Sequence, residues 1–247
     1  MEVKHIDINC DVGEGMDNEP QLFPYISSCN IACGGHAGDE DTMRKIALLA
    51  KEYNIKVGAH PSYPDKENFG RKVLKITKEE LIKSIQEQVH TFVKVIKTEG
   101  IALNHIKPHG ALYNEIAKNR EEAKTFLRAI HQFKQGAIVY VPYKSAIAKE
   151  ALNQGYAIKY EAFCDRNYNE DLTLLSRKQN NALITERKEV LNHILQMVKK
   201  NSVKTLSGVS TKINADTFCI HGDTLKAVEI LAYLSKELPK RGIHINK

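Results

Sequence analysis

The sequence of 247 residues predicts a single α/β domain spanning 1–247, folded as a distorted seven-stranded (β/α) TIM-like barrel. Short apolar segments alternate with amphipathic helical segments, which is typical of a parallel sheet. A His, Asp or Glu, with Gly or Pro nearby, lies at the end of most apolar segments. In such barrels the site lies at the C-terminal ends of the strands. A doubly wound open sheet is the alternative, and its ligand would also lie beyond the strand ends.

Seven segments have the alternating or continuous apolar pattern of strands. They cover residues 6–11, 29–33, 56–60, 104–107, 137–141, 157–161 and 217–220. The segment 137–141 is apolar throughout, as expected for a strand that is covered on both faces.

The helices are predicted from apolar periodicity and from capping residues. Asp39 is a candidate N-cap for a helix over 39–53, and the sequence Thr77-Lys78-Glu79-Glu80 is a capping box that opens a long helix. Further helices are expected over 120–134, 143–154 and 186–200, with a last one ending near residue 238. Two loops remain, 61–76 and 162–184. A loop as long as the second is uncommon in a compact domain unless it is functional.

Composition excludes several functional classes. The net charge is +6, but the basic residues are spread along helical segments and there is no Trp, so we expect no nucleic-acid partner. No apolar run approaches the roughly 18 residues of a membrane span, and no signal-peptide core follows Met1. The five cysteines include no CxxC pair, which predicts free thiols. We therefore expect a cytoplasmic protein without a membrane partner.

The sequence Lys107-Pro108-His109-Gly110 is the strongest local signal. Lys107 and His109 are two residues apart in an extended segment, so their side chains point the same way. Pro108 keeps Lys107 extended, and Gly110 allows a sharp exit from the strand. This design presents two polar side chains to one space. Replacing Lys107 by alanine is therefore expected to impair turnover while leaving the fold intact.

Polar residues at the other strand ends complete the candidate site. We expect the catalytic residues to be Asp11, Lys107, His109 and Asp165. We expect the substrate-binding residues to be Asn9, His36, His60, Arg71, Glu161, Arg166, His221 and Asp223. The four histidines of this set should surround one pocket at one end of the barrel. Structural roles stay open for each residue, such as capping by the aspartates or a loop ion pair between Asp165 and Arg166.

Three chemistries fit this set of residues. His and Asp side chains can bind a divalent metal, for which Asp11, His60 and His109 are candidates, although no HxxxH or HExxH spacing is present. A carboxylate with a histidine can perform acid–base chemistry on an amide, and Lys or Arg can hold an anion. A nucleophilic cysteine is less favoured. The sequence lacks GxxxxGK[ST], and the acidic loop around Glu14 is too short for a dinucleotide fingerprint.

Seven ordered motifs resemble those of the LamB/YcsF-like family, the family of the A subunit of bacterial 5-oxoprolinase. They lie at residues 7–15, 30–38, 58–61, 69–71, 107–114, 161–166 and 221–223. The resemblance covers about residues 5 to 235 and implies a barrel of the glycoside hydrolase and polysaccharide deacetylase type. Departures are Gly35, where the family usually has Phe, Cys164 in place of Ala, and Glu170-Asp171 in place of Asp-Gly. Gly35 is expected to enlarge or loosen the pocket.

The resemblance also implies ATP-dependent opening of 5-oxo-L-proline to L-glutamate together with two further subunits, B and C. Phosphorylation of the lactam oxygen would make a leaving group, and Asp11, His109 or Asp165 would activate water. Lys107 and Arg166 would hold the substrate carboxylate or the phosphoryl oxygens. ATP, with Mg²⁺, would bind here or on a partner, so the chain alone should hydrolyse 5-oxoproline poorly. Two rival hypotheses are a stand-alone metal-dependent deacetylase of N-acetylated sugars and a non-catalytic scaffold protein within the complex.

Overall fold

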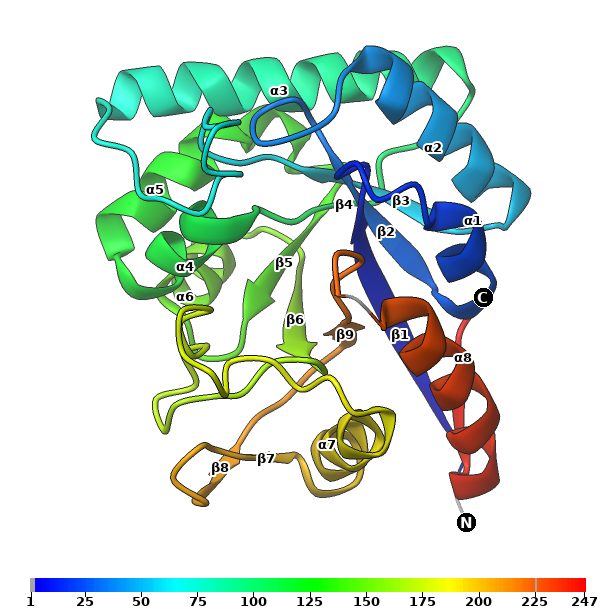
Figure 1. Ribbon diagram of the computed structural model, residues 1–247. Coiled ribbons are helices and arrows are strands. Elements are labelled where there is room, and N and C mark those ends of the chain that lie inside the picture. Colours follow the sequence, from blue (N-terminus) through cyan, green and yellow to red (C-terminus); the bar gives the residue numbers. More distant parts are fainter. Residues whose placement is uncertain (1–2, 225) are drawn as a thin grey trace.

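A computed structural model describes residues 3–224 and 226–247 of the chain. Seven parallel strands close into a barrel, because each strand pairs with the next and the last returns to the first (Figure 1). These strands are β1 (Lys4–Val12), β2 (Ser28–Ala32), β3 (Lys56–His60), β4 (His105–Ile106), β5 (Ile138–Pro142), β6 (Ile158–Phe163) and β9 (Thr217–Cys219). The predicted seven-stranded barrel is confirmed, and the open sheet is excluded.

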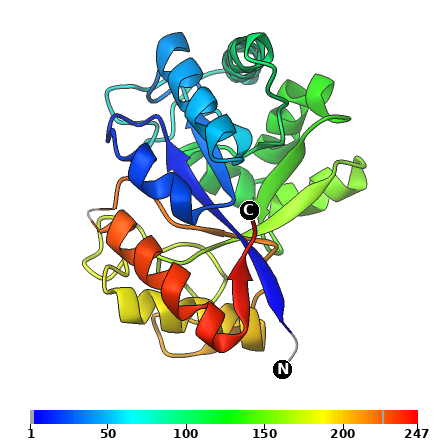
Figure 2. The ribbon, with the colours of Figure 1, turned by 90° about the vertical axis from the view of Figure 1, so that its right-hand side faces the viewer.

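Helices surround the outside of the barrel, as the two views in Figures 1 and 2 show. The longer ones are α2 (Glu40–Glu52), α3 (Lys78–Thr98), α4 (Gly110–Lys118), α5 (Arg120–Ala129), α6 (Ala146–Asn153), α7 (Arg187–Lys200) and α8 (Ala227–Glu237). Short turns of helix are α1 (Glu19–Leu22) and the 3₁₀ segments Phe23–Tyr25, His131–Phe133 and Pro239–Arg241.

The predicted helix starts are confirmed by their caps. The side chain of Asp39 accepts a hydrogen bond of 2.8 Å from the Thr42 amide at the start of α2. At the start of α3, the Thr77 hydroxyl accepts from the Glu80 amide, and the Glu80 carboxylate accepts from the Thr77 amide. Both caps satisfy backbone amides that have no partner within the helix.

Several elements differ from the sequence-based expectations. The helix expected over 120–134 ends at Ala129, and α4 precedes it. The hairpin of β7 (Ser202–Lys204) and β8 (Ser210–Lys212) is largely exposed and polar, so it has no apolar strand pattern. The strand β10 (Ile243–Ile245) pairs in parallel with the N-terminal part of β1, beyond the segment of β1 that pairs with β9. Three residues of β10 are too few for a period-2 pattern to be recognised.

The interior of the barrel is polar, and its outer face is apolar. Along β1, Ile6, Ile8 and Cys10 are buried within the hydrophobic core that the helices cover. The alternate residues Asp7 and Asn9 form hydrogen bonds with side chains of neighbouring strands. The alternation seen in the sequence therefore separates a core from a buried column of polar groups. That column lies beneath the strand ends and fixes the side chains above it.

Gly58 in β3 is required by this column, and its replacement should destabilise the protein. A Cβ atom at Gly58 would lie 2.1 Å from Nε2 of His105. The His105 ring cannot swing away easily, because it stacks 4.0 Å from Tyr140 and its Nε2 lies 2.7 Å from Asn30 Oδ1. Gly58→Ala should therefore lower the free energy of unfolding by about 1–3 kcal/mol, as overpacked cores do.

Urea denaturation measures this loss, with Gly136→Ala as the matched control. A Cβ at Gly136 meets no atom within 4 Å, so the control should stay within about 0.5 kcal/mol of the native protein. Equal urea midpoints for the two variants would show that the barrel interior can accommodate a Cβ atom at Gly58.

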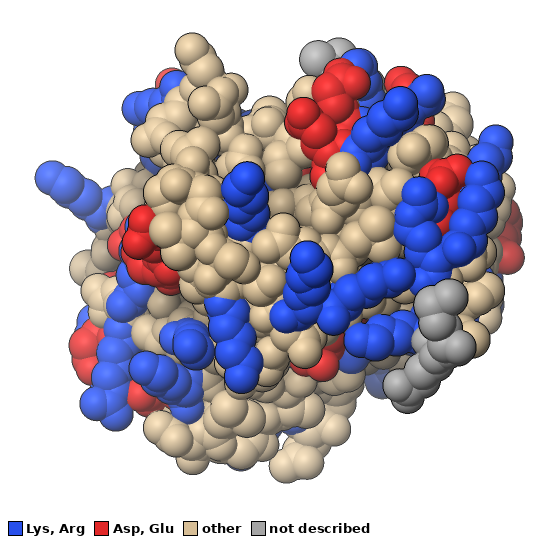
Figure 3. Space-filling view, turned by 90° about the horizontal axis from the view of Figure 1, so that it is seen from below, with Lys and Arg blue, Asp and Glu red and all other residues tan. Residues whose placement is uncertain are grey.

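The basic side chains that give the net charge of +6 are spread over the surface. Figure 3 shows the face that carries α7 and the β7–β8 hairpin, where Lys and Arg side chains are prominent and uncharged or acidic residues lie between them. Among the described residues, none of the helices combines the length and the apolar character needed to cross a membrane.

Candidate functional site

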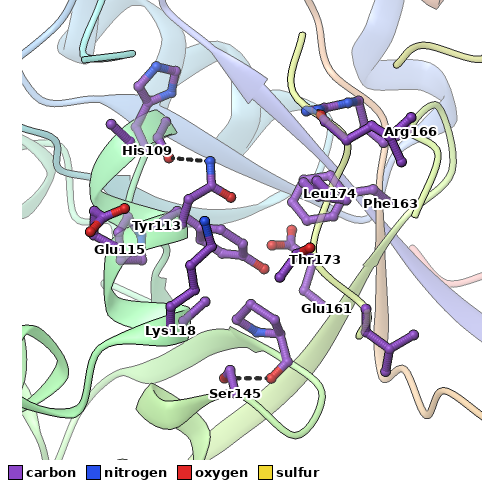
Figure 4. A pocket seen from close by; sticks show the side chains of 18 of the residues that line it. His109, Tyr113, Glu115, Lys118, Ser145, Glu161, Phe163, Arg166, Thr173 and Leu174 are labelled. Atoms are coloured by element: carbon purple, nitrogen blue, oxygen red, sulfur yellow. Dashed lines mark hydrogen bonds between the residues drawn. The ribbon is translucent and has the colours of Figure 1, made fainter. Parts of the chain in front are cut away.

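A cavity of about 590 Å³ lies at the C-terminal ends of the strands. Figure 4 shows side chains that line it, from the end of β6, from the start of α4 and from the loop over 164–186. The lining includes the buried polar residues Asp11, His60, Lys107, His109 and Glu161. A volume of this size suits a small-molecule ligand.

Lys107 is buried between two carboxylates at the end of β4. Its Nζ lies 2.8 Å from Asp11 Oδ1 and 3.0 Å from Glu161 Oε1, and it also contacts Cys219 Sγ at 3.1 Å. Burial alone would lower the pKa of Lys107, but Asp11, Cys219 and Glu161 together raise this pKa well above its ordinary value. Lys107 is therefore a fixed positive charge rather than a base.

Asp11 is held ionised by its neighbours. Burial opposes ionisation, but the neighbouring His60 and Lys107 keep the pKa of Asp11 well below its ordinary value. Oδ1 of Asp11 accepts a hydrogen bond of 2.7 Å from the side-chain Nδ2 of Asn30, and Oδ2 lies 3.4 Å from His60 Nε2. The carboxylate thus connects Lys107 to the histidines.

Glu161 keeps acceptor capacity beside the cavity. Neither carboxylate oxygen of Glu161 has a hydrogen-bond partner among the described residues, although Lys107 Nζ is close enough for an ion pair. Tyr113 lies next to it, and burial followed by the charge of Glu161 raises the pKa of the Tyr113 phenol well above its ordinary value. Figure 4 shows both side chains at the cavity wall.

His60 and His109 face each other through ring nitrogens. Nδ1 of His60 lies 2.7 Å from the Lys107 carbonyl oxygen, and Nε2 of His109 lies 3.0 Å from the Phe69 carbonyl oxygen. The remaining nitrogens, Nε2 of His60 and Nδ1 of His109, are 3.0 Å apart. Burial, followed by His36 and His60, lowers the pKa of His109 well below its ordinary value, so His109 is neutral.

Glu14 joins this histidine cluster from the loop after β1. Its Oε1 lies 3.0 Å from His36 Nε2 and 3.3 Å from His109 Nδ1, and its side chain is only 4% exposed. Gly13 and Gly15 on either side have φ values of 75° and 84°, which side chains other than glycine rarely adopt. Glu14 is not among the site residues predicted from the sequence. Its two flanking glycines are the signal for a turn that brings the carboxylate back.

Asp165 and His221 form a second pair at the cavity. Both oxygens of Asp165 lie 3.0 Å from Nδ1 of His221, and Oδ2 also accepts from the His221 amide and the Thr224 hydroxyl. Burial opposes ionisation of Asp165, but His221 and then Arg166 lower its pKa to about 2. Asp165 is completely buried and His221 lines the cavity. Asp165 therefore orients His221, which presents its other nitrogen.

Three arginines, Arg71 from the loop after β3 and Arg166 and Arg177 from the loop after β6, surround the cavity. Arg166 donates to the carbonyl oxygens of Leu175 and Ala182, and no carboxylate lies within ion-pair distance of it among the described residues. Burial, followed by Arg177, lowers the pKa of Arg166 to about 10. The other two cations share one partner. Asp223 Oδ2 lies 2.5 Å from Arg71 and 3.5 Å from Arg177.

Not every predicted site residue reaches the cavity. Asp11, His60, Arg71, Lys107, His109, Glu161, Arg166 and His221 line it, whereas Asn9, His36, Asp165 and Asp223 do not. Asn9 lies one level deeper on β1 than Asp11, and His36 lies behind His109, with its ring stacked 3.7 Å away. The four histidines thus gather at one end of the barrel, with His36 in a second layer. The roles assigned from the sequence stay predictions.

The structure shows no added space beside Gly35. A Cβ atom at Gly35 would lie 2.3 Å from Gln88 Oε1 and 2.4 Å from Ser62 Oγ. The space beside Gly35 is therefore filled by Gln88 from α3. Gly35 is not among the residues that line the cavity.

Known proteins similar in sequence identify the family of this chain. The family model described as the LamB/YcsF family matches residues 6–247. The chain belongs to the LamB/YcsF family. A relative from Thermococcus sibiricus, named as the A subunit of 5-oxoprolinase, is 43% identical and covers 97% of this chain and 96% of its own. Another of the same name, from Bacillus licheniformis, is 38% identical with 98% of each chain covered.

Two solved structures are similar to this chain in fold. The crystal structure of a lactam utilization protein from Thermus thermophilus has a TM-score of 0.90 and 32% identity, covering 100% of this chain and 99% of its own. A family 4 carbohydrate esterase from Streptomyces lividans has a TM-score of 0.54 at 9% identity, covering 99% and 92%. The second likeness concerns the fold alone. It confirms the expected barrel type.

Proposed function

We propose that this chain is the A subunit of an ATP-dependent 5-oxoprolinase, which opens the lactam 5-oxo-L-proline to L-glutamate. The observation that carries the proposal is the full-length match to relatives with that name, at 38–43% identity. The cavity supports it, because it places buried carboxylates, a lysine and oriented histidines around a space suited to a small molecule. Carboxylates and histidines in such positions can perform acid–base chemistry on an amide.

In this proposal the substrate carboxylate binds at the arginine side of the cavity. Arg166 supplies a guanidinium without a carboxylate partner among the described residues, and Arg71 adds a second positive charge to the lining. Arginine is suited to carboxylate and phosphate groups because of its planar, forked donors. The lactam ring then lies toward Lys107, whose fixed charge favours negative charge that develops on the reacting oxygen.

Proton transfer in this proposal falls to His221. Asp165 accepts from Nδ1 of His221, so Nε2 is the nitrogen that can take or give a proton. This assigns an orienting role to Asp165, which the sequence analysis had treated as a candidate base. Asp11 remains ionised beside Lys107 and keeps it charged.

We propose that ATP, with Mg²⁺, binds at a site on or shared with partner subunits B and C. The sequence offers no phosphate-binding GxxxxGK[ST] loop, which supports a nucleotide site supplied by a partner. We also propose that the complex is cytoplasmic, since all five cysteines are free thiols.

The test is glutamate release from 5-oxoproline by the purified chain, with ATP, before and after addition of subunits B and C from the same organism. We expect little or no release by the chain alone and ATP-dependent release by the mixture. ATP-dependent release by the chain alone would place the nucleotide site here. Release of acetate from N-acetylated sugars without ATP, and no glutamate from the mixture, would favour the deacetylase alternative. Full activity of a mixture containing Asp11→Asn would favour a scaffold.

A further inference from the structure

We propose that Glu14, His36, His60 and His109 form a binding site for a transition-metal cation of the Zn²⁺ type. One ligand atom of each of these residues lies within 4.8 Å of the others. The inference concerns a metal held by this chain itself, independent of ATP and of the proposed reaction. It differs from the sequence-based candidates by adding Glu14 and His36 and by leaving Asp11 outside the ligand set.

His60 and His109 each direct one ring nitrogen at a backbone carbonyl oxygen. A carbonyl oxygen only accepts hydrogen bonds, so His60 must carry its proton on Nδ1, toward Lys107, and His109 on Nε2, toward Phe69. Nε2 of His60 and Nδ1 of His109 then lie 3.0 Å apart, too close for two bare lone pairs. A proton between these two nitrogens or a cation bound by both relieves the repulsion. Metal-ligating histidines commonly donate their second ring nitrogen to a carbonyl in this way.

The four candidate ligand atoms are close enough together for one metal ion. Bonds of 2.0–2.1 Å to Zn²⁺ in a tetrahedron would place neighbouring ligand atoms about 3.3 Å apart. Glu14 Oε1 lies 3.3 Å from His109 Nδ1, 3.9 Å from His60 Nε2 and 3.0 Å from His36 Nε2. These separations are close to those of a ligand shell, and to share one ion the His36 ring must also tilt out of its parallel stack on His109. A ring of nitrogen atoms with one carboxylate favours Zn²⁺ over Mg²⁺, which prefers oxygen ligands.

The carboxylates around the histidine cluster leave an excess of buried negative charge. The carboxylates of Asp11, Glu14 and Glu161 are each 4% exposed or less, and the only lysine or arginine paired with any of them, among the described residues, is Lys107. Buried charge of one sign is costly unless it is balanced. A divalent cation among the histidines would balance the excess negative charge.

A cation bound by these residues would lie at the wall of the cavity. His60 and His109 belong to the cavity lining, and Figure 4 shows His109 at its wall. A cation held there would supply a Lewis acid next to the space for the ligand. The second group of metal-binding residue types, Asp11, Cys219 and His221, is not part of the proposal, because Lys107 already occupies its centre through Asp11 and Cys219.

The test measures metal binding directly, without ATP, lactam or partner subunits. The purified chain is stripped with a chelator, dialysed against micromolar Zn²⁺ and analysed for bound metal by plasma mass spectrometry. Its melting temperature is recorded with and without the ion. We expect about one Zn²⁺ per chain and a higher melting temperature. Mg²⁺ at the same concentration should do neither.

Two variants test the location of the site, and a third variant serves as the control. Glu14→Gln and His109→Gln should each weaken Zn²⁺ binding by tenfold or more, and Glu14→Gln provides the answer if His109→Gln does not fold. His90→Gln is the control, because His90 is an exposed residue on α3 and belongs to neither group of metal-binding residue types. The proposal is overturned if the native chain binds no Zn²⁺, or if Glu14→Gln binds it as tightly as the native chain. A negative result would leave the proposed 5-oxoprolinase activity unaffected.

Discussion

Replacing Lys107 by alanine is expected to lower the free energy of unfolding by about 3–5 kcal/mol and to abolish turnover by the reconstituted enzyme. The reason is that Asp11 and Glu161 would both remain buried without the ammonium group between them. Removing one partner of a buried ion pair leaves an uncompensated charge, which is far more harmful than losing an exposed pair. The sequence suggested a variant that folds normally. The burial of Lys107 changes that expectation.

A double variant separates the structural effect from the catalytic one. Lys107→Ala combined with Glu161→Gln removes one positive and one negative charge, so it should recover part of the lost stability. Turnover should stay absent, because the fixed charge near the reacting oxygen is still missing. Urea unfolding measures the first quantity and glutamate release measures the second. Normal turnover by the double variant would remove Lys107 from the proposed chemistry.

The arrangement of the barrel was predictable because local patterns agree with the fold. The segment 6–11 alternates between apolar and polar residues, and the structure places the two sets on opposite sides of β1. Asp39 and Thr77 start their helices as predicted, since a cap depends only on residues within one turn. Short elements such as β10 depend on a distant partner and leave little pattern in the sequence.

The candidate site was predictable as a set but not as a geometry. Lys107 and His109 come together because they are two residues apart at a strand end. Lys107 is buried between Asp11 on β1 and Glu161 on β6. Both carboxylates are distant from Lys107 in the sequence, so its burial could not be predicted from residue spacing. Glu14 was missed because the path of a loop with two glycines is set by what it packs against. Its three histidine neighbours come from different loops and strands.

Asp165→Asn should reduce kcat of the reconstituted enzyme by about 10²–10⁴-fold, the range of general acid–base catalysis. Both oxygens of Asp165 lie 3.0 Å from His221 Nδ1, so the carboxylate fixes a proton on that nitrogen and frees Nε2 for the cavity. An asparagine side chain can turn its amide toward Nδ1 and favour the other tautomer. The loss should fall on kcat more than on KM, because Asp165 does not line the cavity.

Thr224→Val is the matched control for this variant. It removes the hydroxyl that donates to Asp165 Oδ2 at 3.1 Å but keeps the carboxylate and its contact with His221. Its loss of kcat should be about tenfold, which corresponds to roughly 1.5 kcal/mol, the low end for a hydrogen bond to a charged group. Thermal melting checks that both variants fold. If Asp165→Asn lowers the melting temperature but leaves kcat and the pH–rate profile unchanged, Asp165 only holds the loop after β6 in place. His221 would then not need a fixed tautomer for the reaction.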